Sequence, residues 1–276
     1  MRKIIIFTDL DGTLLDSHTY SFRDALPSIQ LLREKDIPLV ICSSKTRAEI
    51  EYYRRNLKNQ HPFISENGGG IFIPKGYFKS NSSDLKFRIV RGRKYDTVIL
   101  GSPYKDLSTM IQELRKQGYP VKGFGDMTAE EVAALTNLSI HEAMMAKERD
   151  FDEPFLFEGD DAEIQRLSKV IRSKGFTITR GRFFHILGNS DKGMAVSILS
   201  ELYKKQFGEI LTVAVGDSPN DLPMLKKVDK PVIVQKPDGS YDPQLNLPGI
   251  IKADDIGPRG WDKAIVKLLS AFRPSG

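Results

Sequence analysis

Two aspartates follow a short apolar run near the start of the chain, in the stretch Asp9-Leu10-Asp11-Gly12-Thr13. The preceding run, Ile4 to Thr8, predicts a buried strand. A strand that ends in two carboxylates one residue apart places both acids at the carboxyl edge of a sheet. Active sites of open α/β folds lie at that edge. The stretch therefore predicts an α/β fold with its chemistry beside Asp9 and Asp11.

The two acids suit metal-assisted chemistry on phosphorus. Neighbouring carboxylates repel each other when both are ionised, so the pair favours a bound cation such as Mg²⁺ or a shared proton. One acid can then attack phosphorus while the other donates and accepts a proton. A solvated turn and a calcium-binding loop are the alternatives. Leu14 and Leu15 disfavour the calcium loop because they stand where it needs oxygen ligands.

The composition indicates an ordinary globular protein. The 276 residues are 40% hydrophobic, enough for one large or two modest domains, and no apolar run approaches the roughly 20 residues of a membrane helix. Since Met1-Arg2-Lys3 leads straight into the first strand without a signal peptide, we expect a cytoplasmic protein that binds no membrane. The single cysteine, Cys42, follows an apolar run and is expected to be buried.

The net charge of +5 does not point to nucleic acid. Lys and Arg residues are spread along the chain and are mostly interleaved with acids. A basic surface around an anionic small molecule explains the charge, and we expect a phosphorylated small-molecule substrate and no nucleic acid. The sequence carries no information on the oligomeric state.

Hydroxyl groups follow the second predicted strand, Pro38 to Cys42, in Ser43-Ser44-Lys45-Thr46. Thr46 and Glu49 form a capping box that predicts a helix to about Asn56. Hydroxyls and free amides before a helix also bind anions. We expect Ser43 to bind phosphate, while capping is favoured over phosphate binding for Ser44 and Thr46.

A glycine-rich turn, Glu66-Asn67-Gly68 followed by Gly69 and Gly70, separates the apolar pieces Pro62 to Ile64 and Ile71 to Ile73. Asn-Gly is a strong hairpin signal. Consecutive glycines also let a backbone approach a ligand closely. Both interpretations stay open, and the second makes Glu66, Asn67 and Gly68 candidate substrate-binding residues.

Carboxylates recur at the end of a later strand, Leu211 to Val215, in Gly216-Asp217-Ser218-Pro219-Asn220-Asp221. Asp217, with Asn220 nearby, suits oxygen ligation of Mg²⁺. Asp221 either caps the next helix or serves the metal. The predicted metal-binding set is therefore Asp9, Asp11, Asp217 and Asp221.

Lys192 stands at the start of a predicted helix with one apolar stripe. A cation there opposes the helix dipole, which favours a bound anion nearby over a solvated lysine.

The middle of the chain predicts an inserted domain. A polar stretch from Lys79 to Asp84 indicates a boundary, and the segment 84–189 alternates strand-like and helix-like pieces. It contains two further capping boxes, Thr128 with Glu131 and Ser139 with Glu142, and ends in a predicted hairpin. Its charged run from Arg88 to Lys94 suits a solvated edge strand. We expect an α+β domain over 84–189, inserted into a core of residues 1–83 and 190–276.

Taken in order, four of these features resemble the haloacid dehalogenase superfamily of phosphotransferases. They are the Asp9 to Thr13 stretch, Ser43, Lys192, and Gly216-Asp217 with Asn220-Asp221. The resemblance implies a Rossmann-like parallel sheet with an inserted cap, and a Mg²⁺-dependent phosphatase with an aspartyl-phosphate intermediate. The implied roles are Asp9 as nucleophile, Asp11 as general acid and base, Asp217 as Mg²⁺ ligand, Asp221 as an acid just outside the ligands, and Ser43 and Lys192 as binders of the phosphoryl group.

The insert is similar in length to the cap of the Cof-like sugar phosphatases. Over nearly its whole length the chain most resembles the mannosyl-3-phosphoglycerate phosphatase family, through Ser43-Ser44-Lys45-Thr46, Glu66-Asn67-Gly68-Gly69, Glu153-Pro154-Phe155-Leu156, Gly181-Arg182-Phe183-Phe184-His185 and the Asp217 motif. This resemblance implies hydrolysis of that ester to mannosylglycerate. The alternatives are a glucosyl-3-phosphoglycerate phosphatase, a broader sugar phosphatase, a phosphomutase and a non-catalytic binding protein.

Three residues of the predicted closing hairpin are candidates for binding the part of the substrate beyond the phosphate. Arginine suits bidentate recognition of a carboxylate, so Arg180 or Arg182 is expected to bind the glycerate. Arg180 stands where the family pattern has glycine, and this difference leaves the identity of the substrate undecided. His185 either hydrogen-bonds a sugar hydroxyl or packs beside Phe184 and Ile186.

Overall fold

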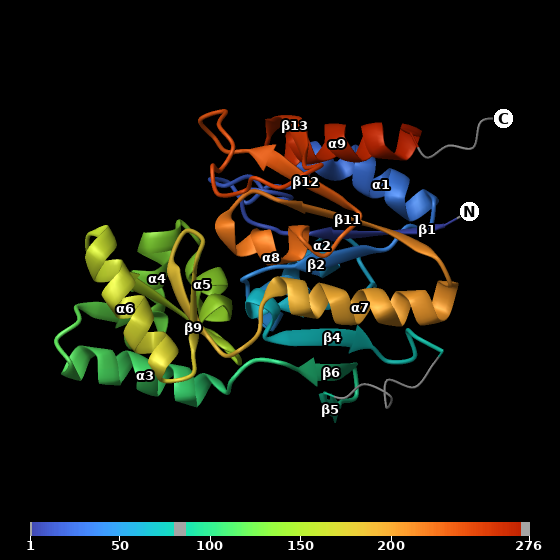
Figure 1. Ribbon diagram of the computed structural model, residues 1–276. Helices are drawn as coiled ribbons and strands as arrows, with labels where there is room; N and C mark the ends of the chain where they lie inside the picture. Colours follow the sequence, from blue (N-terminus) through green and yellow to red (C-terminus); the bar gives the residue numbers. More distant parts are fainter. Residues whose placement is uncertain (1, 80–86, 272–276) are drawn as a thin grey trace.

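The computed structural model describes residues 2–79 and 87–271, and the strands of these ranges form two sheets (Figure 1). The larger sheet has, in spatial order, β13 (Ile251–Ile256), β12 (Lys230–Gln235), β11 (Ile210–Gly216), β1 (Lys3–Thr8), β2 (Leu39–Cys42), β3 (Phe63–Ser65), β4 (Gly70–Pro74), β6 (Tyr95–Ile99) and β5 (Arg88–Arg91). The strands from β13 to β3 run parallel, and the last three are antiparallel. The predicted α/β fold with a parallel core sheet is confirmed.

Helices cover both faces of this sheet because its central strands are apolar on both faces. In β1, Ile6 packs with α1 (Leu26–Glu34), α2 (Arg47–Asn56) and α9 (Gly257–Ala271). Its neighbours Ile5 and Phe7 pack on the opposite face with α7 (Lys192–Phe207) and α8 (Leu222–Leu225). Cys42 is buried on that second face, as predicted.

The smaller sheet is antiparallel, in the order β7 (Val121–Gly123), β8 (Asp152–Phe157), β10 (Phe184–Leu187) and β9 (Thr177–Arg180). Helices α3 (Tyr104–Lys116) and α6 (Asp161–Ser173) pack on one face. Helices α4 (Ala129–Thr136) and α5 (Ile140–Lys147) form a second apolar cluster with Leu156 and Phe183. We call the unit from α3 to β10 the cap; Figure 1 shows it beside the larger sheet.

The predicted capping boxes begin α2, α4 and α5, and the closing hairpin is β9 with β10. These predictions are confirmed. Each was possible because the signal involves only residues close together in the sequence. No helix of the described ranges is long and apolar enough to span a membrane.

The expected start of the insert differs from the structure. The boundary at residues 83 and 84 lies outside the described residues, but β5 and β6, predicted within the insert, extend the larger sheet. The strand pattern of Tyr95–Ile99 was predicted correctly, yet a strand pattern does not say which sheet the strand joins. Pairing of β6 with β4 decided it. The solvated edge strand is confirmed, since β5 is the last strand of the sheet and Arg88 and Arg91 are exposed.

Candidate active site

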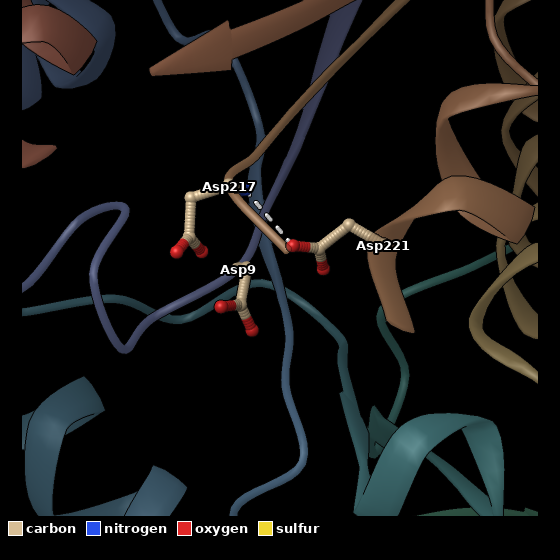
Figure 2. Close-up of side chains that lie close together, drawn as sticks. All are labelled: Asp9, Asp217 and Asp221. Atoms are coloured by element: carbon tan, nitrogen blue, oxygen red, sulfur yellow. Dashed lines mark hydrogen bonds between the residues drawn. The ribbon is translucent and has the colours of Figure 1, made fainter. Parts of the chain in front are cut away.

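Three aspartates meet at the carboxyl ends of β1 and β11. These strands pair in parallel with Thr8 opposite Val215, so Asp9, one residue beyond Thr8, and Asp217, two residues beyond Val215, come close together. Asp221 joins them from the turn after β11, and one carboxylate oxygen from each of the three lies within 4.8 Å of the others (Figure 2). This group could hold a metal ion.

Lys192 connects two of these acids. Its Nζ donates hydrogen bonds to Oδ1 of Asp9 (2.8 Å) and to Oδ1 of Asp221 (2.7 Å), and the whole residue is 1% exposed. A solvated lysine is therefore excluded. Asp191 caps the helix by accepting a hydrogen bond from the N–H of Met194, which fixes the backbone beside Lys192.

The second oxygen of Asp221 is also occupied. Oδ2 accepts hydrogen bonds from the backbone N–H groups of Asp217 (3.0 Å) and Ser218 (3.1 Å), so Asp221 caps the short 3₁₀ turn Pro219–Asp221. The predicted cap of the next helix is not formed, because the Asp221 side chain makes no cap hydrogen bond to α8; it closes the preceding turn and holds Lys192 instead, and its role toward a metal stays a prediction. Asp221 has no oxygen left without a hydrogen bond.

The cluster has more negative than positive charge. Burial raises the pKa of Asp9 to about 7, and nearby Asp221 and Asp11 add to the increase although Lys192 opposes it. The pKa of Asp217 lies well above its usual range, chiefly through burial and then through Asp221 and Asp9. Burial lowers the pKa of Lys192, but Asp221 and Asp9 outweigh burial and raise it. The raised pKa values mean that protonation of the acids reduces the excess negative charge. A bound divalent cation would balance that charge instead.

Gly12 leaves the space that such an ion needs. Its φ is +75°, and a Cβ added there would lie 2.8 Å from Oδ2 of Asp217. The other oxygen of Asp217, Oδ1, accepts a hydrogen bond from the Thr13 hydroxyl at 2.9 Å. The side chain of Asp217 is thereby oriented while Oδ2 stays available. Asp9, Asp217 and this open cradle fit a hard divalent cation.

Asp11 lies at the edge of the cluster, with its side chain 40% exposed. Its Oδ1 is 3.1 Å from Nζ of Lys45, which also lies 3.2 Å from Oε1 of Glu49. Lys45 is buried and lies over the ring of Tyr20, with Nζ 5.0 Å from its centroid. The Lys45 ion pairs were not predicted; Lys45 stands directly before the N-cap residue of α2, a position similar to the helix start that identified Lys192.

A cavity of about 740 Å³ lies above these acids, between the core and the cap. Its walls include Asp9, Asp11, Asp217, Ser44, Arg180, Arg182 and His185 among the predicted residues. The cap contributes residues of α4, β9 and β10, and the core contributes the loops after β1, β2, β11 and β12. The volume is that of a small-molecule site.

The two predicted arginines differ in what they contact. Arg182 donates hydrogen bonds to the backbone carbonyls of Leu135 (2.8 Å) and Thr136 (3.0 Å) at the end of α4. Arg180 lies over the ring of Phe184, 4.7 Å from its centroid, and has no ion-pair partner among the described residues. Arg180 is thus the better candidate for a substrate carboxylate.

Ser43, Glu66, Asn67 and Gly68 are not among the residues that line the cavity, and their assignment as substrate contacts stays a prediction. Ser43 is fully buried, and its Oγ accepts a hydrogen bond from the N–H of Lys45. The carboxylate of Glu66 accepts hydrogen bonds from the N–H groups of Asp150 and Phe151, just before β8. A polar side chain at a strand end can therefore hydrogen-bond the backbone of another segment, and not only a ligand.

The glycine-rich turn is the predicted hairpin, since β3 and β4 pair in antiparallel fashion around it. Its glycines also permit a close approach to the backbone, but the groups that come close are other parts of the protein. A Cβ on Gly68, where φ is +96°, would clash with the backbone of Asp191 and Lys192. A Cβ on Gly69 would clash with Phe151. Gly68 therefore lets the first turn of α7, and Lys192 with it, reach the acids.

Asp152 and Arg149 are further buried charges at this junction that were not predicted. Arg149 donates a hydrogen bond to the carbonyl of Ser44 (3.0 Å), and Asp152 accepts one from Asn67 (2.7 Å). These contacts connect the cap to the core beside the cavity. No local sequence pattern identifies them, because the partners are 85 or more residues apart.

Comparison with known proteins gives consistent results. A family model described as haloacid dehalogenase-like hydrolase matches residues 6–238. A protein of Methanococcoides burtonii, named glucosyl-3-phosphoglycerate/mannosyl-3-phosphoglycerate phosphatase, is 48% identical over 269 residues, 97% of each chain. The mannosyl-3-phosphoglycerate phosphatase of Pyrococcus furiosus is 40% identical over 82% of this chain and 88% of its own.

Among solved structures, a phosphatase of the haloalkanoate superfamily from Bacteroides thetaiotaomicron is similar in fold. The TM-score is 0.68 at 17% identity, over 99% of this chain and 96% of the other.

Proposed function

The chain belongs to the haloacid dehalogenase-like hydrolase family, and on that basis we propose that it is a phosphatase that hydrolyses mannosyl-3-phosphoglycerate to mannosylglycerate. Glucosyl-3-phosphoglycerate is the second proposed substrate, because the 48% identical relative is named for both esters. The observation that carries the proposal is the pair Asp9 and Asp217 in the wall of the cavity between core and cap, with Lys192 hydrogen-bonded to Asp9 from behind. We place the reaction in the cytoplasm, where phosphate esters of sugars are held by their charge.

In the first step, Asp9 attacks phosphorus. An O–P bond forms between its carboxylate and the phosphoryl group while the P–O bond to the glycerate oxygen breaks, and Asp11 gives the departing oxygen a proton. In the second step Asp11 takes a proton from water, whose oxygen attacks phosphorus and releases Asp9. Asp11 suits both transfers because its side chain lines the cavity and is partly exposed.

Lys192 holds the Asp9 carboxylate at 2.8 Å and supplies positive charge next to the reacting group. We propose Mg²⁺ as the cofactor, held by Asp9, Asp217 and the backbone carbonyl of Asp11. When bound, it would neutralise charge on the phosphoryl oxygens. Asp221 supports this arrangement from outside the ligand set, since both of its oxygens already accept hydrogen bonds.

The remaining substrate contacts are assigned to the cavity walls. Arg180 is proposed to pair with the glycerate carboxylate, because it is the arginine of the cavity wall whose guanidinium makes no hydrogen bond to a backbone carbonyl of the described residues. Ser44 lines the cavity next to Lys45 and is proposed to contact the phosphate.

Phosphate release tests the proposal. Both glycosyl-3-phosphoglycerates and a panel of sugar phosphates are assayed with Mg²⁺ and with EDTA, for the wild type, Asp9→Asn and the control Asp254→Asn, an exposed acid on β13. We expect the wild type to prefer the glycosyl-3-phosphoglycerates and to lose phosphate release in EDTA. Of the two variants, only Asp9→Asn should lose phosphate release.

Other outcomes reject defined parts of the proposal. Equal rates on simple sugar phosphates would reject the substrate and keep the chemistry. Wild-type release by Asp9→Asn would reject the mechanism. Transfer between sugar positions without net release would indicate a phosphomutase, and Mg²⁺ binding without any turnover would indicate a binding protein.

A further inference from the structure

A chain of buried hydrogen bonds connects the loop after β11 to His185 in the cap sheet. Ser218 Oγ donates to Oδ1 of Asn220 (2.6 Å), and Nδ2 of Asn220 donates to Oδ1 of Asn67 (3.0 Å). Nδ2 of Asn67 then donates to Oδ2 of Asp152 (2.7 Å), and Nδ1 of His185 lies 2.8 Å from Oδ1 of Asp152. The last four residues are each less than 8% exposed. This series of hydrogen bonds therefore crosses the interior between the core and the cap.

The carboxylate of Asp152 sets the direction of the bonds that meet it. An ionised carboxylate only accepts hydrogen bonds, so Asn67 must present its NH₂ group and His185 must carry a proton on Nδ1. The guanidinium of Arg149, 3.7 Å from Oδ1 of Asp152, adds a positive charge beside that carboxylate. A neutral imidazole protonated on Nδ1 has its acceptor on Nε2.

The other ring nitrogen of His185 is available to a ligand. Phe184 and Ile186 pack toward α3 and α6, so His185 lies on the opposite face of β10, where it lines the cavity. Among the described residues no hydrogen bond involves its Nε2. Asp152 lies on the same face of the sheet, diagonally across from His185 in the pairing of β8 with β10.

We propose that His185 determines specificity by accepting a hydrogen bond, through Nε2, from a hydroxyl group of the substrate beyond the phosphate. The ligand class is a sugar or polyol ester of phosphate. Asp152 and Asn67 are positioning residues: they fix the tautomer of His185 and join it to the loop that carries Asp217. This inference rests on the proposed function.

The first test is kinetic and compares two substrates. The measured quantity is the kcat/KM for a glycosyl-3-phosphoglycerate divided by that for p-nitrophenyl phosphate, which has no hydroxyl group. In His185→Ala this ratio should fall roughly tenfold, the range expected for one lost hydrogen bond to a buried partner. His185→Gln, whose side-chain oxygen can accept the same bond, should recover part of the ratio. The exposed cap residue His141, changed to Ala, is the matched control.

The second test takes its decisive result from the wild-type protein alone. Nitrogen NMR of the wild-type protein should show His185 as the neutral tautomer protonated on Nδ1, and Asp152→Asn should shift it toward the Nε2-protonated form. A wild-type His185 protonated on Nε2 alone, or a ratio in His185→Ala equal to that of His141→Ala, would overturn the inference. Failure of the wild type to release phosphate from any ester would instead reject the proposed function.

Discussion

The hydroxyl of Tyr20 donates a hydrogen bond of 2.7 Å to the backbone carbonyl of Thr136. Tyr20 belongs to the core, in the loop after β1, and Thr136 is the last residue of α4 in the cap. Asn137 Nδ2 reaches the carbonyl of His18 in the same loop, at 3.3 Å. The loop after β1 is thus joined to the cap in the wall of the cavity.

Removing that hydroxyl should weaken closure of the cavity. In Tyr20→Phe we expect kcat/KM for the glycosyl ester to fall about three- to tenfold, because the hydroxyl donates to Thr136 and accepts from Arg182, and both hydrogen bonds between cap and core are lost. Steady-state kinetics measure the change. Tyr119→Phe, in the apolar cluster of α3 and α6, is the control. Equal kinetics for the two variants would mean that the Tyr20 contact has no part in closure.

Replacement of Lys45 should destabilise the protein and lower its activity. Lys45 and Glu49 form a buried ion pair, so Lys45→Met leaves a buried carboxylate without its cation, a loss of about 3–5 kcal/mol in the free energy of unfolding. Adding Glu49→Gln should recover part of the stability but not the activity, because Asp11 still lacks Lys45. Denaturant unfolding and phosphate release measure both effects.

The exposed residue Lys204, paired with Glu201, gives the control for that series. Lys204→Met should change stability by no more than about 0.5 kcal/mol. Full recovery of activity in the Lys45→Met, Glu49→Gln double variant would show that Lys45 acts only on stability.

Gly12 and Gly118 separate backbone strain from crowding of the metal cradle. Both have positive φ, +75° and +88°, but an added Cβ meets Asp217 at Gly12 and nothing within 4 Å at Gly118. Each Gly→Ala change should reduce stability by roughly 1–2 kcal/mol. Only Gly12→Ala should also weaken Mg²⁺ binding, measured by calorimetry. Equal Mg²⁺ affinities in the two variants would contradict the assignment of the cradle.

The buried acid Glu66 should make stability depend on pH. Burial raises its pKa from 4.5 to about 8, against the opposing charge of Arg149. Between these values the folded protein holds a proton that the unfolded chain has released, so stability falls as pH rises, by at most about 1.4 kcal/mol per pH unit. The difference in unfolding free energy between wild type and Glu66→Gln, measured from pH 5 to 8, should follow this slope.

Glu158→Gln, at an exposed position, should leave that slope unchanged. A difference in unfolding free energy between wild type and Glu66→Gln that stays constant over the same range would show that Glu66 is ionised in the folded protein.

Local sequence determined the elements and the floor of the site. Apolar runs predicted β1, β2 and β11, and capping boxes at Thr46, Thr128 and Ser139 predicted the starts of three helices, because these signals act between residues at most a few positions apart. The parallel pairing of β1 with β11 then brought Asp9 and Asp217 together with no further information.

Tertiary structure alone decided which polar side chains face the cavity. Glu66 and Asn67 bond to groups about 85 residues away, Arg182 binds the end of α4, and β6 joins β4 rather than the cap sheet. The physical reason is that a buried polar group must find a partner wherever the fold supplies one. The sequence names the donors and acceptors, but only the packing of cap against core determines which of them remain for the substrate.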